Sequence, residues 1–213
     1  MFLDRAAAGK KLAATLIDLQ GSPDPLVVLA IPRGGVIVAR EVAVTLHAPL
    51  DVCLTHKIGA PGNSELAIGA VADDGTTLFD QALIEALCVS RQHLDREIDL
   101  WRHELARRAA VYRQGRARVP VKDAVAIVVD DGVATGSTLI AALRSTRAAG
   151  AKTVIAAVPV GPHGMVYGEL AREADRVECL LAPREFYAVG VFYRYFEQVT
   201  DEEVVEAMTK DIL

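Results

Sequence analysis

Residues 128–138, VVDDGVATGST, combine two carboxylates with a small turn rich in hydroxyl groups. Asp130 and Asp131 end an apolar run, and the turn opens a helical pattern. Backbone N–H groups before a helix suit a phosphate, whereas carboxylates need donors such as the adjacent hydroxyls of a sugar. A ribose 5-phosphate meets both demands. The turn that would hold its phosphate consists of Ala134, Thr135, Gly136, Ser137 and Thr138.

A second candidate anion site follows an earlier apolar run, at AIPRGG, residues 30–35. Arg33 offers a fork of donors to an anion, and Gly34 and Gly35 allow the backbone to approach a ligand closely. The sequence lacks a G-x-x-x-x-G-K-[ST] loop and a G-x-G-x-x-G loop after a strand. Two common nucleotide-binding motifs are therefore excluded.

The elements that position these residues follow an alternating pattern. Runs rich in β-branched residues and leucine predict strands at residues 25–31, 50–56, 66–71, 124–129 and 153–160. Helical patterns cover residues 36–45 and 139–149, and Gly150 is suited to a left-handed helix cap. The alternation predicts one α/β domain over residues 1–213, with a mostly parallel, twisted sheet flanked by helices in Rossmann-like layers. Ligands of such sheets bind at the carboxyl ends of strands.

Two segments depart from this alternation. Residues 80–115 read as an inserted helical pair or one long helix. This insertion and the residues just after it are rich in arginine, which predicts a solvated helix face, a subunit contact or a lid over an anionic ligand. Residues 177–213 are expected to form a C-terminal, hood-like segment, closed by a helix with Thr200 and Glu203 at capping-box spacing. The arginines are Arg102, Arg107, Arg108, Arg113, Arg116 and Arg118.

VVDDGVATGST closely resembles the signature of type I phosphoribosyltransferases, and AIPRGG resembles the pyrophosphate loop of that family. The resemblance covers residues 25–159 and leaves the insertion outside it. It implies that the donor, 5-phosphoribosyl 1-diphosphate, places its phosphate at residues 134–138 and its hydroxyls on Asp130 and Asp131. It also implies that Lys57 joins Arg33 in binding pyrophosphate, and that residues 59–64 form a mobile loop over the reacting centre.

The resemblance implies displacement of pyrophosphate by a nitrogenous base, in nucleobase salvage. Such chemistry needs positioning and charge stabilisation rather than a covalent nucleophile, and we expect Lys57, Arg33 and Asp131 to supply them. Mg²⁺ would be held mainly through the substrate, with Asp130 and Asp131 as its protein contacts. A regulator that binds the donor or a nucleotide without turnover is the alternative. A sugar-phosphate hydrolase ranks last, because the strand ends offer no nucleophile.

The acceptor base stays open. Members of the family that act on 6-oxopurines usually carry an acidic residue at the position of Ala134. Alanine at this position resembles the adenine-type members, and it excludes a general base there. Phe186 or Tyr187 resembles the base-stacking aromatic of the family, although a packing role is an equal alternative. Glu65 is a further candidate for contact with the acceptor or the leaving group.

Composition narrows the class of protein. A net charge of −5 over 213 residues disfavours a nucleic-acid-binding surface, and no apolar run is long enough for a membrane span. Three scattered cysteines predict buried thiols without disulfides and a cytoplasmic location. The five histidines lack the spacing of a zinc site. We expect small-molecule substrates and a homo-oligomer, most simply a dimer.

Overall fold

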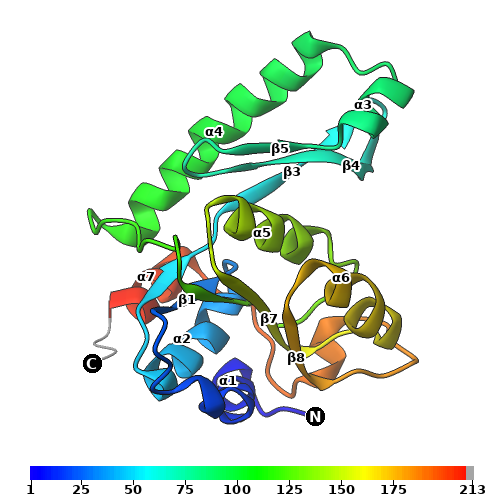
Figure 1. Ribbon diagram of the computed structural model, residues 1–213. Coiled ribbons are helices and arrows are strands. Elements are labelled where there is room, and N and C mark those ends of the chain that lie inside the picture. The colour runs from blue at the N-terminus through cyan, green and yellow to red at the C-terminus, as the bar shows by residue number, and fades with distance from the viewer. Residues whose placement is uncertain (210–213) are drawn as a thin grey trace.

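The computed structural model describes residues 1–209 and contains two separate sheets (Figure 1). The main sheet has the strand order β2-β1-β6-β7-β8, and all neighbouring strands run parallel. The expected α/β fold with a parallel sheet is therefore confirmed. Its strands are β1 (Leu26–Ala30), β2 (Leu50–Val52), β6 (Val125–Val129), β7 (Thr153–Val160) and β8 (Arg176–Leu181).

Helices cover both faces of the main sheet, as the apolar sequences of its inner strands require. Along β6, Ile127 and Val129 pack with one group of helices, whereas Ala126 and Val128 pack with the other. The first group is α1 (Arg5–Thr15), α2 (Gly34–Leu46) and α7 (Asp201–Thr209). The second is α5 (Ser137–Ala148) and the π-helix η2 (Met165–Leu170), which α6 (Ala171–Glu173) continues. A short 3₁₀ helix, η1 (Ile17–Leu19), follows α1.

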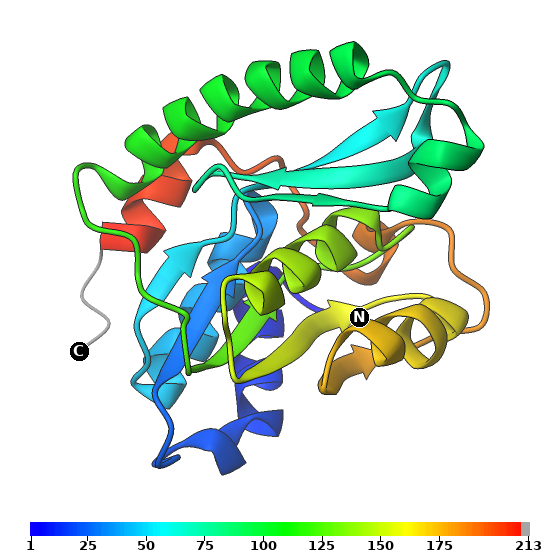
Figure 2. The ribbon, with the colours of Figure 1, turned by 45° about the horizontal axis from the view of Figure 1, so that its top comes forward.

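The second sheet belongs to an arm, defined as residues 55–113, which lies across α5 (Figure 2). Its antiparallel strands order β3-β4-β5. The single strand expected at residues 50–56 is wrong, because β2 ends at Val52 and β3 starts in the other sheet. The strand at 66–71 is also not part of the parallel sheet, and residues 59–64 form the tip of a hairpin, with a turn at 61–62. The arm comprises β3 (Thr55–Ala60), β4 (Asn63–Ala72), β5 (Thr77–Phe79), α3 (Gln81–Ala86) and α4 (Arg91–Arg113).

Buried ion pairs join Arg113, the last residue of α4, to Asp51 in β2 of the main sheet and to Asp73, which follows β4 within the arm. The Arg113 guanidinium donates from Nε to Asp51 Oδ1 over 2.8 Å and from Nη1 to Asp73 Oδ2 over 2.5 Å. Arg116 donates to the carbonyl of Met208 in α7. Arginines of this segment therefore act as anchors as well as forming a solvated face, where Arg107 and Arg108 both pair with Glu104.

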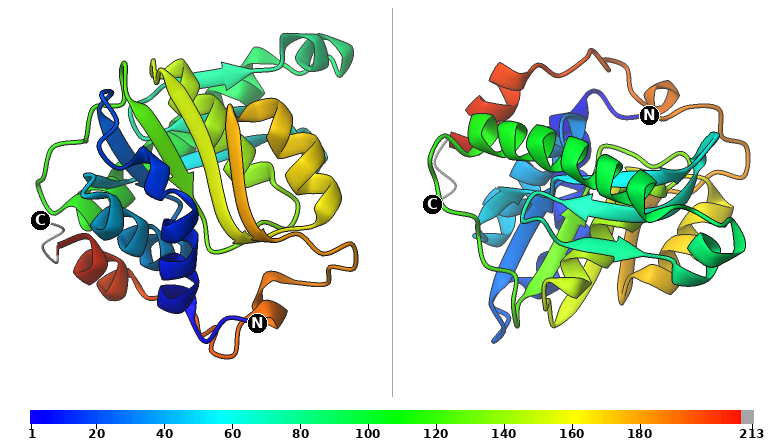
Figure 3. Two further views of the ribbon diagram at one scale, coloured as in Figure 1. Left: turned by 60° about the horizontal axis from the view of Figure 1, so that its bottom comes forward. Right: turned by 90° about the horizontal axis from the view of Figure 1, so that it is seen from above.

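The N-terminal residues pair with a segment that precedes the last helix, beside the carboxyl edge of the main sheet (Figure 3). We call residues 182–199, which include the 3₁₀ helix η3 (Val189–Phe192), the hood. The Phe2 N–H donates to the Phe192 carbonyl over 2.7 Å, and Phe2 and Tyr193 form a parallel bridge. The expected hood-like segment starts too early at residue 177, because β8 is an edge strand of the main sheet.

The helix after the hood begins at the expected capping box, in which Thr200 and Glu203 exchange hydrogen bonds of 2.8 and 3.2 Å. No helix within residues 1–209 combines the length and apolarity that crossing a bilayer requires.

Candidate functional site

The expected phosphate turn lies between β6 and α5. Gly136 has a φ of 75° and precedes the first residue of α5, so the unpaired N–H groups of the first helical turn face this loop. This left-handed backbone favours glycine, and a Cβ at position 136 would also lie 2.5 Å from Met165 Sδ. The Thr135 and Ser137 hydroxyls lie 2.9 Å apart. The loop therefore presents hydroxyls and helix-end N–H groups, an arrangement that binds anions.

The AIPRGG loop lies beside the acid pair because β1 and β6 are adjacent and parallel, with Ala30 opposite Val129. A Cβ on Gly34 would overlap Asp131 Oδ2 and lie 2.7 Å from Asp131 Cγ. A Cβ on Gly35 would lie 2.9 Å from Asp130 Cα, so this glycine also packs tightly against the acid pair. The Pro32–Arg33 peptide is cis, and the Arg33 side chain is exposed to solvent. The two motifs therefore form one site.

The two carboxylates have different surroundings. The Asp131 N–H donates to Asp130 Oδ1 over 2.8 Å, and burial together with the Asp131 charge raises the pKa of Asp130 well above its usual range. Asp131 receives Arg5 Nε on Oδ2 over 2.7 Å, and its carbonyl accepts the Tyr193 hydroxyl over 2.5 Å. Asp130 thus holds its proton more tightly than a solvated aspartate does, while Asp131 has a cation beside it.

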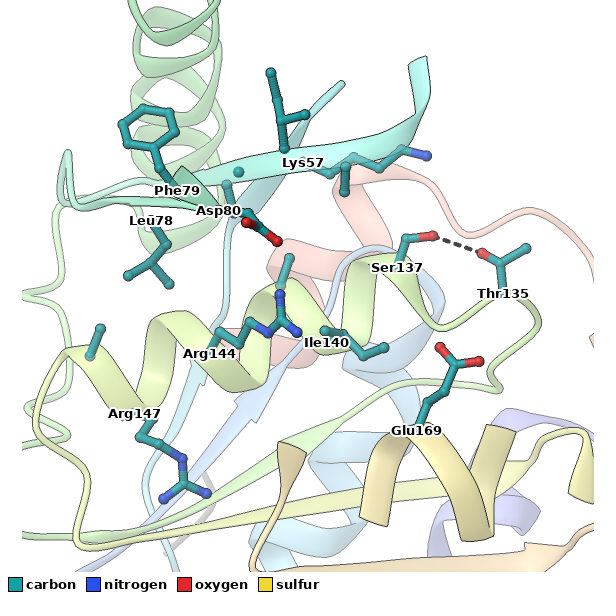
Figure 4. A pocket seen from close by; sticks show the side chains of 16 residues that line it. Lys57, Leu78, Phe79, Asp80, Thr135, Ser137, Ile140, Arg144, Arg147 and Glu169 are labelled. Atoms are coloured by element: carbon teal, nitrogen blue, oxygen red, sulfur yellow. Dashed lines mark hydrogen bonds between the residues drawn. The ribbon is translucent and has the colours of Figure 1, made fainter. Parts of the chain in front are cut away.

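Lys57 lies on β3 of the arm, outside the main sheet. It lines, together with Thr135 and Ser137, a cavity of about 790 Å³ between the arm and α5. Figure 4 shows Lys57 on the strand above Ser137, whereas Leu78 points down from the arm toward α5. The structure therefore places Lys57 on the same cavity as two hydroxyls of the phosphate turn.

Two of the candidate base-binding residues, Phe186 and Tyr187, lie in the hood, and Glu65 belongs to β4 of the arm. Phe186 stacks on Phe192 with ring centroids 5.5 Å apart and packs in an apolar cluster of the hood. Tyr187 is 88 % exposed. The side chain of Glu65 lies outside the described part of the structure. The hood contacts the acid loop through the Tyr193 hydroxyl and through Val189, whose Cγ2 would lie 2.9 Å from a Cβ at Gly132.

A metal ion at this site would need ligands from the substrate in addition to protein side chains. No group of three or more His, Cys, Asp or Glu residues within the described chain is placed to hold a metal ion. Asp130 and Asp131 are oxygen donors of the kind Mg²⁺ prefers, but Mg²⁺ takes about six oxygen ligands in octahedral geometry. The residues fit magnesium if substrate oxygens complete its coordination.

Sequence reasoning missed Arg5 and Tyr193, which fix Asp131 from distant parts of the chain. Arg5 lies 126 residues before Asp131 and Tyr193 lies 62 residues after it. The prediction of buried cysteines is wrong for Cys88, which is exposed. Burial raises the pKa of the Cys53 thiol to about 12.

Known proteins resemble this chain in amino-acid sequence and, in one crystal structure, in fold. The crystal structure of TT1426 from Thermus thermophilus is 41 % identical and superposes with a TM-score of 0.89, covering 98 % of this chain and 97 % of that one. Two Mycobacterium tuberculosis proteins, MT0597 and Rv0571c, provisionally named phosphoribosyl transferases, are 44 % identical over 205 residues. That match covers 96 % of this chain and 46 % of each relative, so the chain spans about half their length. The model of the phosphoribosyl transferase domain matches residues 2–191. The chain therefore belongs to the phosphoribosyl transferase domain family.

Proposed function

We propose that this chain binds 5-phosphoribosyl 1-diphosphate and transfers its phosphoribosyl group to a nitrogenous base, in nucleobase salvage. The observation that carries the proposal is the contact of Gly34 with Asp131, which joins the two expected ligand loops in one site. The phosphate of the donor would bind residues 134–138, and its hydroxyls would bind Asp130 and Asp131. Its pyrophosphate would bind the loop of Arg33, Gly34 and Gly35, with Lys57 contributing from the arm.

The residues would act by position and charge. Asp131 orients the sugar, and the cations Arg33 and Lys57 stabilise the negative charge that grows on pyrophosphate as its bond to the anomeric carbon breaks. The base forms the new bond to that carbon. Magnesium, held by Asp130, Asp131 and substrate oxygens, would neutralise part of the pyrophosphate charge.

The acceptor is constrained by what lies near the sugar site. Ala134 supplies no carboxylate in the phosphate turn, so a proton acceptor for the base has to come from elsewhere. Phe186, Tyr187 and Glu65 remain the candidates for contact with the base. We expect the protein to act as a homodimer in the cytoplasm, on small molecules and without nucleic acid.

Turnover is tested by measuring magnesium-dependent pyrophosphate release from the donor across a panel of purine, pyrimidine and nicotinic-type acceptors. Release with at least one acceptor supports the transferase. Tight binding of the donor without release for any acceptor would support the regulator instead, although Arg33 and Lys57 favour catalysis because a nucleotide sensor needs no pyrophosphate contacts.

The two loops are tested separately by paired substitutions. Asp131→Asn should weaken binding of 5-phosphoribosyl 1-diphosphate more than binding of pyrophosphate, because it removes a carboxylate from the sugar hydroxyls. Arg33→Gln should weaken pyrophosphate binding and spare ribose 5-phosphate. Asp95→Asn and Arg91→Gln, on the exposed start of α4, are matched controls. Equal losses for both ligands in either variant would contradict the assignment.

A further inference from the structure

Arg5, the first residue of α1, joins three parts of the molecule at the acid pair. Its Nε donates to Asp131 Oδ2 over 2.7 Å, and its Nη1 donates to the Glu197 carbonyl of the hood over 2.8 Å. Its guanidinium carbon lies 3.8 Å from the centroid of the Phe196 ring. The side chain is only 11 % exposed. Arg5 is therefore a fixed part of the site and not a solvated surface arginine.

We propose that Arg5 is a positioning residue that holds the Asp131 carboxylate in the orientation that receives the sugar hydroxyls. The inference rests on the proposed function, because it names the group that prepares the donor site. Arg5 touches Asp131 and acts through it.

The geometry of the ion pair supports this role. The bond from Arg5 uses Oδ2 of Asp131, so the same carboxylate still offers Oδ1 to a hydroxyl group. The Tyr193 hydroxyl holds the carbonyl of Asp131, so both the backbone and the side chain of this residue are fixed. The guanidinium is itself fixed by stacking and by the Glu197 carbonyl, and a preorganised donor loses less conformational freedom when it binds.

The charges support it as well. Asp130 and Asp131 are adjacent carboxylates, and like charges at one site repel each other. A buried cation beside Asp131 offsets that repulsion. Arg5 also borders the pyrophosphate loop, since its Nε would lie 2.8 Å from a Cβ on Gly34.

In the opposite role, Arg5 would mask Asp131 and would have to leave before the sugar binds. That role predicts tighter sugar binding once Arg5 is removed.

Calorimetry with two probes, ribose 5-phosphate and pyrophosphate, each with magnesium, tests the proposal on the full chain. Arg5→Met keeps an apolar stem over Phe196 and removes the donors, and we expect it to weaken ribose 5-phosphate binding roughly 10- to 100-fold. Pyrophosphate binding should change by less than about threefold, since its loop is intact. Arg5→Lys should give a smaller loss because the charge remains, and it replaces Arg5→Met if that variant does not fold. Lys11→Met, which removes an exposed charge from the same helix, is the matched control.

Unchanged or tighter ribose 5-phosphate binding in Arg5→Met would overturn the positioning role. An equal loss for both probes would overturn it too, because it would indicate general damage to the site. If the unmodified protein binds neither probe, the proposed function itself fails. If it binds both and Arg5→Met does so equally well, only this inference fails.

Discussion

Replacing Arg113 with methionine should destabilise the protein by about 3 kcal/mol. The substitution leaves Asp51 and Asp73, which are 3 and 4 % exposed, without the guanidinium that pairs with both. Removing one partner of a buried ion pair costs roughly 3–5 kcal/mol. The lower end applies because Asp51 keeps hydrogen bonds from the backbone N–H groups of Val52 and Val119, at 2.7 and 3.0 Å.

The loss is measured by urea unfolding followed by circular dichroism, and it corresponds to a fall in melting temperature of roughly 6–12 °C for a chain of this size. Arg107→Met is the control. Arg107 belongs to the same helix, but its pair with Glu104 is exposed, so its loss should leave the urea midpoint nearly unchanged. If Arg113→Met stays within about 1 kcal/mol of the unmodified protein, the ion pairs do not anchor the arm, and apolar packing of α4 must do so.

Three further predictions concern the site, pH and thiols. Gly34→Ala should weaken ribose 5-phosphate binding roughly tenfold or more, because its Cβ would displace the Asp131 carboxylate; calorimetry that finds equal affinity would contradict this contact. Burial and two neighbouring cations lower the pKa of His56 to about 4, whereas an unfolded histidine titrates near 6.5. The unfolded chain therefore binds more protons between these pH values, and stability should fall by up to about 2 kcal/mol as pH drops from about 6.5 to 4. His56→Gln should reduce that fall in urea midpoints. A thiol reagent at pH 8 should label exposed Cys88 well before Cys53, whose pKa is raised to about 12, and equal labelling rates would refute the burial of Cys53.

The sequence predicted the inner strands of the main sheet and the helices beside them, because a strand buried on both faces needs a continuous apolar run. Residues 50–56 and 66–71 show the limit of this reasoning. Both segments are apolar, but a local pattern does not say which sheet a strand joins. The chain leaves the main sheet after Val52, and the hairpin of β3 and β4 packs on α5 instead. The edge strand β8, half-buried along its whole length, has too weak a pattern to be recognised.

The candidate site was predictable where its residues adjoin in sequence. Strand, acid pair and phosphate turn are consecutive, so their positions follow from the end of β6. Arg5, Tyr193 and Val189 reach the same place only through tertiary packing of α1 and the hood, and no local spacing marks them. Arg113 was expected on a helical surface, because the carboxylates that bury it lie 62 and 40 residues away.

During translation, the hydrogen bond between Arg5 and the Glu197 carbonyl cannot form until the hood has been synthesised. The two residues are 192 positions apart, and ribosomes add about 5–20 residues per second. The ribosome therefore needs roughly 10–40 s to reach Glu197 after it has added Arg5. During that interval the ribosome adds the acid pair and the phosphate turn. The nascent chain still lacks Tyr193, so the bridge between Phe2 and Tyr193 is absent. Under the proposed function, we expect a ribosome-bound chain arrested before the hood to retain 5-phosphoribosyl 1-diphosphate less well than the released protein does.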